Sequence, residues 1–189
     1  TLDSQLVCRA AFICILPVLE ILKTHLGAIG YDSVSIMTRV NYIDLSTAIL
    51  SLTQGETDEV ALMATFACEV HHSDDRFDWT GFYRVTAPEL LKIGPYQGGH
   101  GCLVIPFDRG VCGAAAGTRE TQFIRDVETF EGHIACASST RSELVIPVVN
   151  GAGRLLGVLD IDSDQPAAFD QTDADNLMEL LNTVFADVG

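Results

Sequence analysis

The hydrophobic pattern changes its period near residue 79, and this change limits the fold more than any other feature of the sequence. Before that point, segments 42–52 and 58–67 repeat apolar residues at intervals of three and four, which predicts two helices. After it come six short runs that are rich in β-branched and aromatic residues and separated by Gly, Pro and Asp, which predicts strands. These runs are 79–85, 91–94, 103–106, 120–124, 142–149 and 155–162.

A last helix is predicted near the C-terminus. Segment 169–173 carries polar and acidic residues that suit a helix N-terminus, and the apolar residues after it fall on one helical face. Those residues are Leu177, Leu180, Leu181, Val184 and Val188. Two helices, six strands and a closing helix predict an α+β fold, with an antiparallel sheet of about six strands and helices packed on one face of it.

The net charge excludes a basic surface for nucleic acid. The chain has 11 Lys and Arg against 26 Asp and Glu, a formal charge of −15, whereas phosphate binding needs clustered cations. Residues 1–41 hold three acids and three bases, so the whole surplus of acids belongs to residues 42–189. We therefore divide the chain into an N-terminal extension of unknown role, 1–41, and one compact domain, 42–189.

The apolar stretch 6–22 of the extension is too short and too interrupted to span a membrane, which takes about 20 apolar residues. A signal or anchor is the alternative, but the basic segment that normally precedes an apolar signal region is missing here. We expect a packed helix or an irregular extension, and no association with a membrane.

The six cysteines form two groups by their surroundings. Three lie in apolar, helix-like segments where a cysteine usually packs as a small hydrophobe: Cys8, Cys14 and Cys68. The other three stand beside glycine and other small residues, in segments that we expect to be loops open to reagents: Cys102, Cys112 and Cys136.

Three interpretations of these loop cysteines are open. A zinc site would need His100 and His133 to complete the ligand set, and the cysteine spacings contain none of the Cys-x-x-Cys pairs that structural zinc sites use. Thiol redox chemistry fits better, because a cysteine oxidised to sulfenic acid needs a second accessible cysteine to close a disulfide. Unreactive loop thiols are the third interpretation.

Alternation along the predicted strands brings further polar and aromatic groups together. Trp79 and Tyr83 share one face of the first strand, with a glycine between them. Asp160 and Asp162 share one face of the last strand, and Glu143 opens the strand before it. Such residues often pack in a core or lie in solvent, but together they suit a pocket for a small cation such as an amino group.

Seven strings of the sequence follow one another in a distinctive order. They are WTGFY at 79–83, GPYQGGHGC at 94–102, IPFDRGVCGAAA at 105–116, ET at 120–121, GHIAC at 132–136, SELVIPV at 142–148 and GVLDIDS at 157–163. Their combination resembles the free methionine-(R)-sulfoxide reductases, which are stand-alone GAF-domain enzymes. The resemblance covers 42–185 and implies a GAF-like fold for the compact domain.

The resemblance also implies a reaction. The family reduces free L-methionine-(R)-sulfoxide to L-methionine, uses thioredoxin as the reductant and needs no metal or organic cofactor. By position in the motifs, Cys136 is expected to attack the sulfoxide sulfur, Cys102 to resolve the product, and Cys112 to act as an auxiliary thiol. The family pattern leaves open which of Cys112 and Cys136 attacks first.

Five side chains are expected to form the substrate pocket on the same ground. Trp79 and Tyr83 would wall the pocket, and Glu143, Asp160 and Asp162 would bind the amino group and the sulfoxide oxygen. One of these carboxyls, with Glu143 as the catalytic candidate, would supply the proton that makes the sulfoxide oxygen leave.

The expected thiol chemistry also predicts the cellular compartment of the protein. We expect the cytoplasm, because a thiol cycle needs reducing partners. The apolar helices at both ends of the domain would suit a homodimer. The rival function is a non-catalytic GAF-type sensor that binds a small molecule.

Overall fold

The computed structural model describes residues 39–130, 132 and 138–189. Within these residues, six antiparallel strands form one sheet in the order β3-β2-β1-β6-β5-β4. The strands are β1 Trp79–Ala87, β2 Leu90–Gln97, β3 Val104–Pro106, β4 Gln122–Ile124, β5 Ser142–Val149 and β6 Leu155–Ser163. The helices are α2 Tyr42–Leu52, α3 Glu59–His71, α4 Gly110–Thr118 and α5 Gln171–Val184, with a short 3-10 turn at Val127–Thr129.

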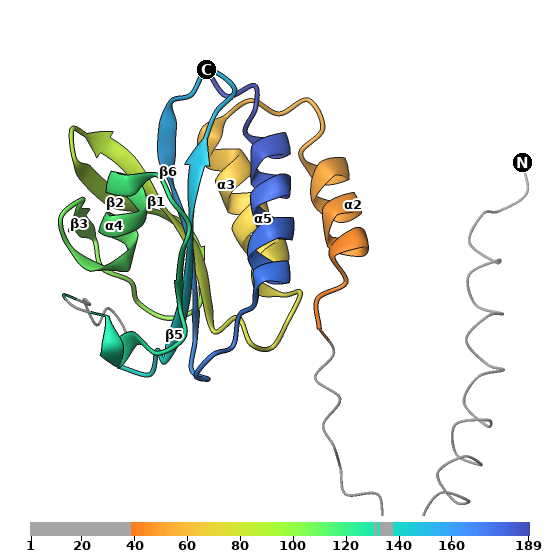
Figure 1. Cartoon of the computed structure of the whole chain (residues 1–189). Helices are drawn as coiled ribbons and strands as arrows, with labels where there is room; N and C mark the ends of the chain where they lie inside the picture. The colour runs from red at the N-terminus through yellow and green to blue at the C-terminus, as the bar shows by residue number, and fades with distance from the viewer. Residues whose placement is uncertain (1–38, 131, 133–137) are drawn as a thin grey trace, which may run out of the picture. The chain divides into compact units, whose positions relative to one another are not determined.

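Helices lie on both faces of the sheet (Figure 1). α3 and α5 pack on one face with α2 outside them, and the larger core between these layers includes the mutually touching rings of Phe66, Phe82 and Phe185. α4 covers the opposite face and closes a second, smaller core. The α+β fold with six antiparallel strands is confirmed, but the expectation that all helices lie on one face is wrong for α4.

The caps of the two helices on the larger core follow from the acids seen in the sequence. The Asp58 side chain accepts a hydrogen bond from the Ala61 amide at the start of α3. At the start of α5, Asp170 and Asp173 form a capping box, in which each side chain accepts a bond from the other's backbone amide. Both predicted helix starts are therefore confirmed, and α3 extends beyond its predicted end to His71.

The glycine-rich segment that sequence reasoning assigned to a loop forms α4 instead. Glycine disfavours a helix, but here it permits a close approach, because a Cβ on Gly113 would stand 2.4 Å from the carbonyl oxygen of Pro106. α4 ends at Arg119, whose φ of 59° lies in the left-handed region. Tertiary packing thus outweighs local propensity, and the interpretation of Cys112 as an open-loop thiol is wrong.

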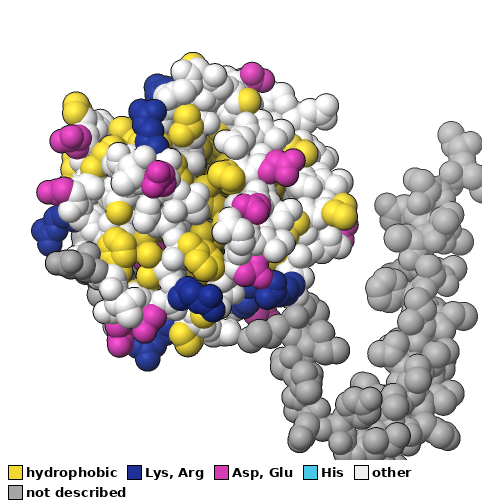
Figure 2. Space-filling model, viewed as in Figure 1, with side chains coloured by type: hydrophobic (Ala, Val, Ile, Leu, Met, Phe, Trp, Pro, Cys, Tyr) yellow, Lys and Arg dark blue, Asp and Glu magenta, His cyan; other side chains and the backbone are white. Residues whose placement is uncertain are grey.

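Acidic and basic side chains are mixed on the face of the molecule that Figure 2 shows. On the face of the described residues in Figure 2, the Lys and Arg side chains are interspersed with Asp and Glu, so no continuous basic area covers that face.

The described part of the chain contains no helix that combines the length and the apolar character needed to cross a membrane.

A buried ionic network ties the larger core together. Arg76, which is 6% exposed, donates to both Asp74 oxygens, to the Asp173 carboxylate and to the Ala168 carbonyl. Asp173 also accepts a 2.7 Å bond from the Tyr42 hydroxyl. The network joins the segment before β1 to the first turns of α2 and α5, so three segments far apart in sequence share one buried ionic network.

Replacing Arg76 with Ala should lower the free energy of unfolding by about 3–5 kcal/mol, because it leaves the buried Asp173 carboxylate without its cation. Arg141→Ala is the matched control. It breaks a 2.7 Å pair with Glu128 at the surface, which is shorter than the Arg76–Asp173 pair but should contribute at most about 1 kcal/mol. Urea denaturation measures both, and equal losses in the two variants would contradict this role for Arg76.

Candidate active site

Two strand pairings place the predicted aromatic and acidic residues side by side. Across the β1–β6 pair, Trp79 lies opposite Asp162, and Asp160 lies opposite Gly81. Across the β5–β6 pair, Glu143 lies opposite Asp162. The sheet therefore brings these side chains together on the face that α4 covers. Alternation predicted the shared face within β1 and within β6, and the strand pairing joins the two sets.

The aromatic part of the site is a stack of three rings. Trp79 stacks on Tyr83 with ring centroids 5.8 Å apart and on Tyr96 with centroids 5.4 Å apart. A Cβ on Gly81 would stand 2.4 Å from the Cβ of Tyr96, so only glycine leaves room for this arrangement. Sequence reasoning missed Tyr96, because its place beside Trp79 depends on the β1–β2 register, in which Tyr96 lies opposite Gly81.

Cys112 lies in the first turn of α4 and faces the carboxylates. Its thiol donates a 3.2 Å hydrogen bond to Oδ2 of Asp160 and lies 4.0 Å from Oε1 of Glu143. All three residues are buried, with 3%, 5% and 6% of Cys112, Asp160 and Glu143 exposed. The other Asp160 oxygen, Oδ1, is buried and has no hydrogen-bond partner. The site therefore contains a carboxylate oxygen that lacks a donor.

Burial in this acidic surrounding raises the pKa of every carboxyl in the cluster. Burial raises the pKa of Asp160 to about 6, although hydrogen bonds from Cys112 and Glu143 oppose the rise. Burial and then the charge of Asp160 raise the pKa of Glu143 and of Asp162 well above their usual values. Burial and mutual repulsion therefore favour protonated forms in this cluster over three full charges.

The same surroundings raise the pKa values of two neighbouring groups, the Cys112 thiol and the Tyr83 hydroxyl. Burial raises the pKa of the Cys112 thiol, and the charges of Asp160 and Glu143 raise it further. Burial, followed by the charge of Asp160, also raises the pKa of the Tyr83 hydroxyl. Cys112 is therefore held as a neutral thiol, which is a poor nucleophile.

The remaining predicted cysteines have different surroundings. Cys102 lies between β2 and β3, packs against the smaller core and is disulfide-bonded. Cys68 on α3 and Cys112 carry free thiols, so neither of them is bonded to Cys102. Cys136, the predicted nucleophile, lies outside the described residues, as do Cys8, Cys14 and His133.

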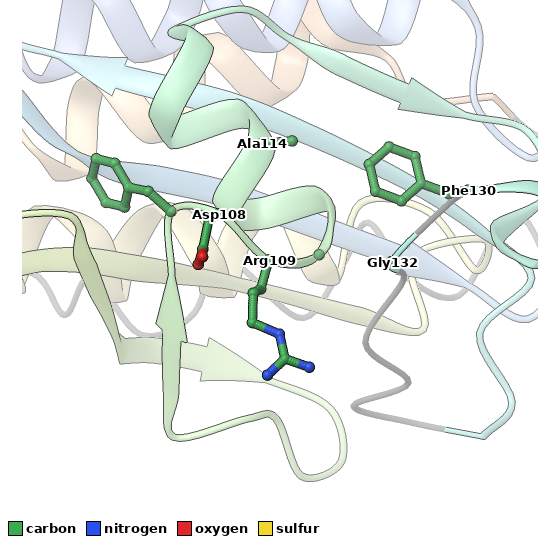
Figure 3. A pocket seen from close by; sticks show the side chains of 7 residues that line it. Asp108, Arg109, Ala114, Phe130 and Gly132 are labelled. Atoms are coloured by element: carbon green, nitrogen blue, oxygen red, sulfur yellow. The ribbon is translucent and has the colours of Figure 1, made fainter.

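A cavity of about 260 Å³ opens at the start of α4 (Figure 3). It is lined by Phe107, Asp108, Arg109, Gly110, Ala114, Phe130 and Gly132. Figure 3 shows the Arg109 side chain extending away from α4. None of the predicted site residues that the structure describes lines this cavity, so the acidic cluster and the cavity are separate features.

A metal ion has one candidate ligand group among the described residues. Ligand atoms of Cys112, Glu143 and Asp160 all lie within 4.8 Å of one another. The Cys3His arrangement considered from the sequence depends on Cys136 and His133, which lie outside the described residues, and is not tested.

Comparison with known proteins gives one consistent result. A family model described as GAF domain matches residues 51–184. The chain is 38% identical to the free methionine-R-sulfoxide reductase of Escherichia coli over 140 residues, 74% of this chain and 84% of that protein. It is 44% identical to the free methionine-R-sulfoxide reductase of Saccharomyces cerevisiae over 109 residues, 57% of this chain and 61% of that protein.

A solved structure extends this similarity to three dimensions. It is the free methionine-R-sulfoxide reductase of Neisseria meningitidis in complex with its substrate, which is 41% identical to this chain and superposes with a TM-score of 0.71. The match covers 76% of this chain and 87% of that chain.

The raised carboxyl pKa values predict how stability depends on pH. Between about pH 4 and about pH 6 the folded state keeps the Asp160 proton that the unfolded chain loses, so the contribution of Asp160 to the free energy of unfolding falls as pH rises. Asp160→Asn should remove this contribution and make the protein more stable at pH 7, by about 3 kcal/mol. Urea titrations at pH 4.5 and pH 7 measure the change.

Asp175→Asn is the control for this experiment, because Asp175 is exposed on α5. It should leave the difference between the two pH values as it is in the unmodified protein. If Asp160→Asn also left that difference unchanged, the buried carboxyl would not hold its proton in the folded state.

Proposed function

We propose a residue-level mechanism from one premise: the chain belongs to the GAF-domain family of free methionine-(R)-sulfoxide reductases. It is an oxidoreductase that converts free methionine-(R)-sulfoxide to methionine. We assign the catalytic domain to residues 42–189, with 1–41 as an extension of unknown role. The observation that carries the mechanism is the buried Cys112–Glu143–Asp160 cluster on the sheet face that also holds Trp79 and Tyr83.

Substrate recognition uses the aromatic wall and the acids together. Trp79 and Tyr83 offer flat aromatic surfaces to the methyl group and sulfur of the substrate side chain, because sulfur packs readily against aromatic rings. The α-ammonium group supplies the donor that Asp160 Oδ1 lacks, and the Asp162 carboxyl lies on the same face. A methionine sulfoxide within a peptide has an amide at this position and would leave the buried acids unpaired, so the free amino acid is preferred.

The reaction begins with attack on sulfur. The Cys136 thiolate attacks the sulfoxide sulfur while a protonated carboxyl, assigned to Glu143, donates to the sulfoxide oxygen. The raised pKa of Glu143 supports this assignment, because the carboxyl still carries its proton near neutral pH. The oxygen passes to Cys136 as a sulfenic acid, and methionine leaves as a thioether.

Regeneration needs two further thiol steps. Cys102 attacks the sulfenic acid, so that a disulfide forms and water is released. A dithiol reductant, which we assign to thioredoxin, then reduces the disulfide by exchange. The disulfide-bonded sulfur of Cys102 and the free thiol of Cys112 support Cys102 as the resolving residue.

Cys112 is assigned an auxiliary role. A thiol held neutral by burial and by two adjacent carboxyls is a poor first nucleophile, which supports Cys136 as the residue that attacks. The dependence on a reducing partner supports a cytoplasmic location, and the apolar helices at both ends of the domain support a homodimer.

Cys136→Ser should abolish the formation of methionine from methionine-(R)-sulfoxide with dithiothreitol, because the attacking sulfur is gone. Cys68→Ser is the control and should keep full turnover, since Cys68 lies on α3 on the opposite side of the sheet. After substrate without reductant, mass spectrometry should find a Cys102–Cys136 disulfide. A link to Cys112 alone would reverse the roles of the thiols, and no methionine from the unmodified protein would favour the sensor function.

Glu143→Gln should lower kcat about 10²-fold or more, because a general acid contributes at least that much and an amide cannot donate a carboxyl proton. Glu179→Gln, at an exposed position on α5, should leave kcat unchanged. Steady-state kinetics on folded variants measures both. Normal turnover by Glu143→Gln would move the acid role to Asp160 or Asp162.

A further inference from the structure

We propose that the reduced protein binds one Zn²⁺ ion through Cys112, Glu143 and Asp160, and that this ion inhibits the enzyme reversibly. The binding itself goes beyond the proposed reaction, which uses no metal. The inhibition rests on the proposed function, because zinc would occupy the carboxylate that is assigned to the substrate ammonium group.

The positions of the ligand atoms suit zinc without a large movement. In a tetrahedral site with usual zinc bond lengths, a thiolate sulfur and a carboxylate oxygen lie about 3.6 Å apart. Cys112 Sγ lies 3.2 Å from Asp160 Oδ2 and 4.0 Å from Glu143 Oε1, so the two distances fall on either side of that value. Shifts of a few tenths of an ångström bring both oxygens to a common ion.

An independent observation in this cluster is a buried carboxylate oxygen without a partner. Asp160 is 95% buried, yet its Oδ1 has no hydrogen-bond partner, which is costly for a carboxylate away from water. Among the ion pairs of the described residues, none brings an Arg, Lys or His to Asp160 or Asp162. A cation bound through Oδ2 would therefore balance the charge of a buried carboxylate whose other oxygen the fold leaves unsatisfied.

The chemistry of the ligands selects the ion. One sulfur and two carboxylate oxygens match zinc, whereas Mg²⁺ and Ca²⁺ take six or more oxygen ligands. The three ligands come from α4, β5 and β6, so the fold holds them in place before the metal arrives. They leave a fourth position for water.

Zinc binding changes no oxidation state. The Cys112 thiol and the Glu143 carboxyl give their protons to solvent as their bonds to zinc form, and chelation reverses the step. While zinc is bound, Asp160 cannot accept a bond from the substrate ammonium group and Glu143 cannot donate a proton. Zinc should therefore compete with methionine-(R)-sulfoxide.

The test is a zinc titration of the reduced full chain, freed of thiol reagents, against a chromophoric chelator. The unmodified protein should bind one equivalent of Zn²⁺. Cys112→Ser and Asp160→Asn should each weaken binding at least tenfold, while Cys68→Ser should bind as the unmodified protein does. Cd²⁺ should give a thiolate charge-transfer band that disappears in Cys112→Ser, and circular dichroism checks that each variant folds.

Three results would overturn the proposal: no stoichiometric zinc binding by the unmodified protein, undiminished binding by Cys112→Ser, or loss of binding in Cys102→Ser. The last result would assign the metal to a site that includes Cys102 instead of the acidic cluster. The titration contains no substrate, so it tests zinc binding even if the methionine assay contradicts the proposed function. In the active enzyme, zinc should raise the KM for the sulfoxide without changing kcat.

Discussion

The hydrogen bond from the Cys112 thiol to the buried Asp160 carboxyl is the interaction on which the rest of the site depends. Asp160 lies in β6, one of the two central strands, and Cys112 lies in the only described helix on that face. The bond fixes the start of α4 over the acids, and the strand registers hold Glu143 beside Asp162 and Trp79. Close packing at Gly113 lets the helix lie near enough for this contact.

Burial of these acids destabilises the fold, but it also raises their pKa values and leaves one carboxylate oxygen without a donor. The larger core, with its aromatic cluster and the Arg76 network, lies on the other face of the sheet and stabilises the domain independently of the site. The smaller core can therefore contain groups that solvent would otherwise ionise. Raised carboxyl pKa values make a proton donor near neutral pH, and the unpartnered Asp160 oxygen makes a cation site. The substrate ammonium group and a metal ion would therefore compete for the Asp160 carboxylate.

Local patterns predicted the elements well, but not the contacts that depend on register or on close packing. Alternation placed Trp79 with Tyr83 on one face of their strand, and Asp160 with Asp162 on one face of theirs. The structure agrees because period-two patterning is a local property. The place of Tyr96 depends on pairing between strands, which no single strand encodes. α4 was missed because its glycines have low helix propensity, and its packing is a tertiary effect. Because α4 was not predicted, Cys112 was expected in an accessible loop, whereas it is buried in the structure.

Infrared spectroscopy of the reduced protein at neutral pH tests the central claim most directly, because it separates protonated carboxyls from carboxylates and detects neutral thiols. We predict a buried protonated-carboxyl band that disappears in Glu143→Gln, together with an S–H band that disappears in Cys112→Ser. Fully ionised carboxyls at neutral pH, or a Cys112 thiolate, would contradict the account of a proton-sharing acidic cluster beside a neutral thiol.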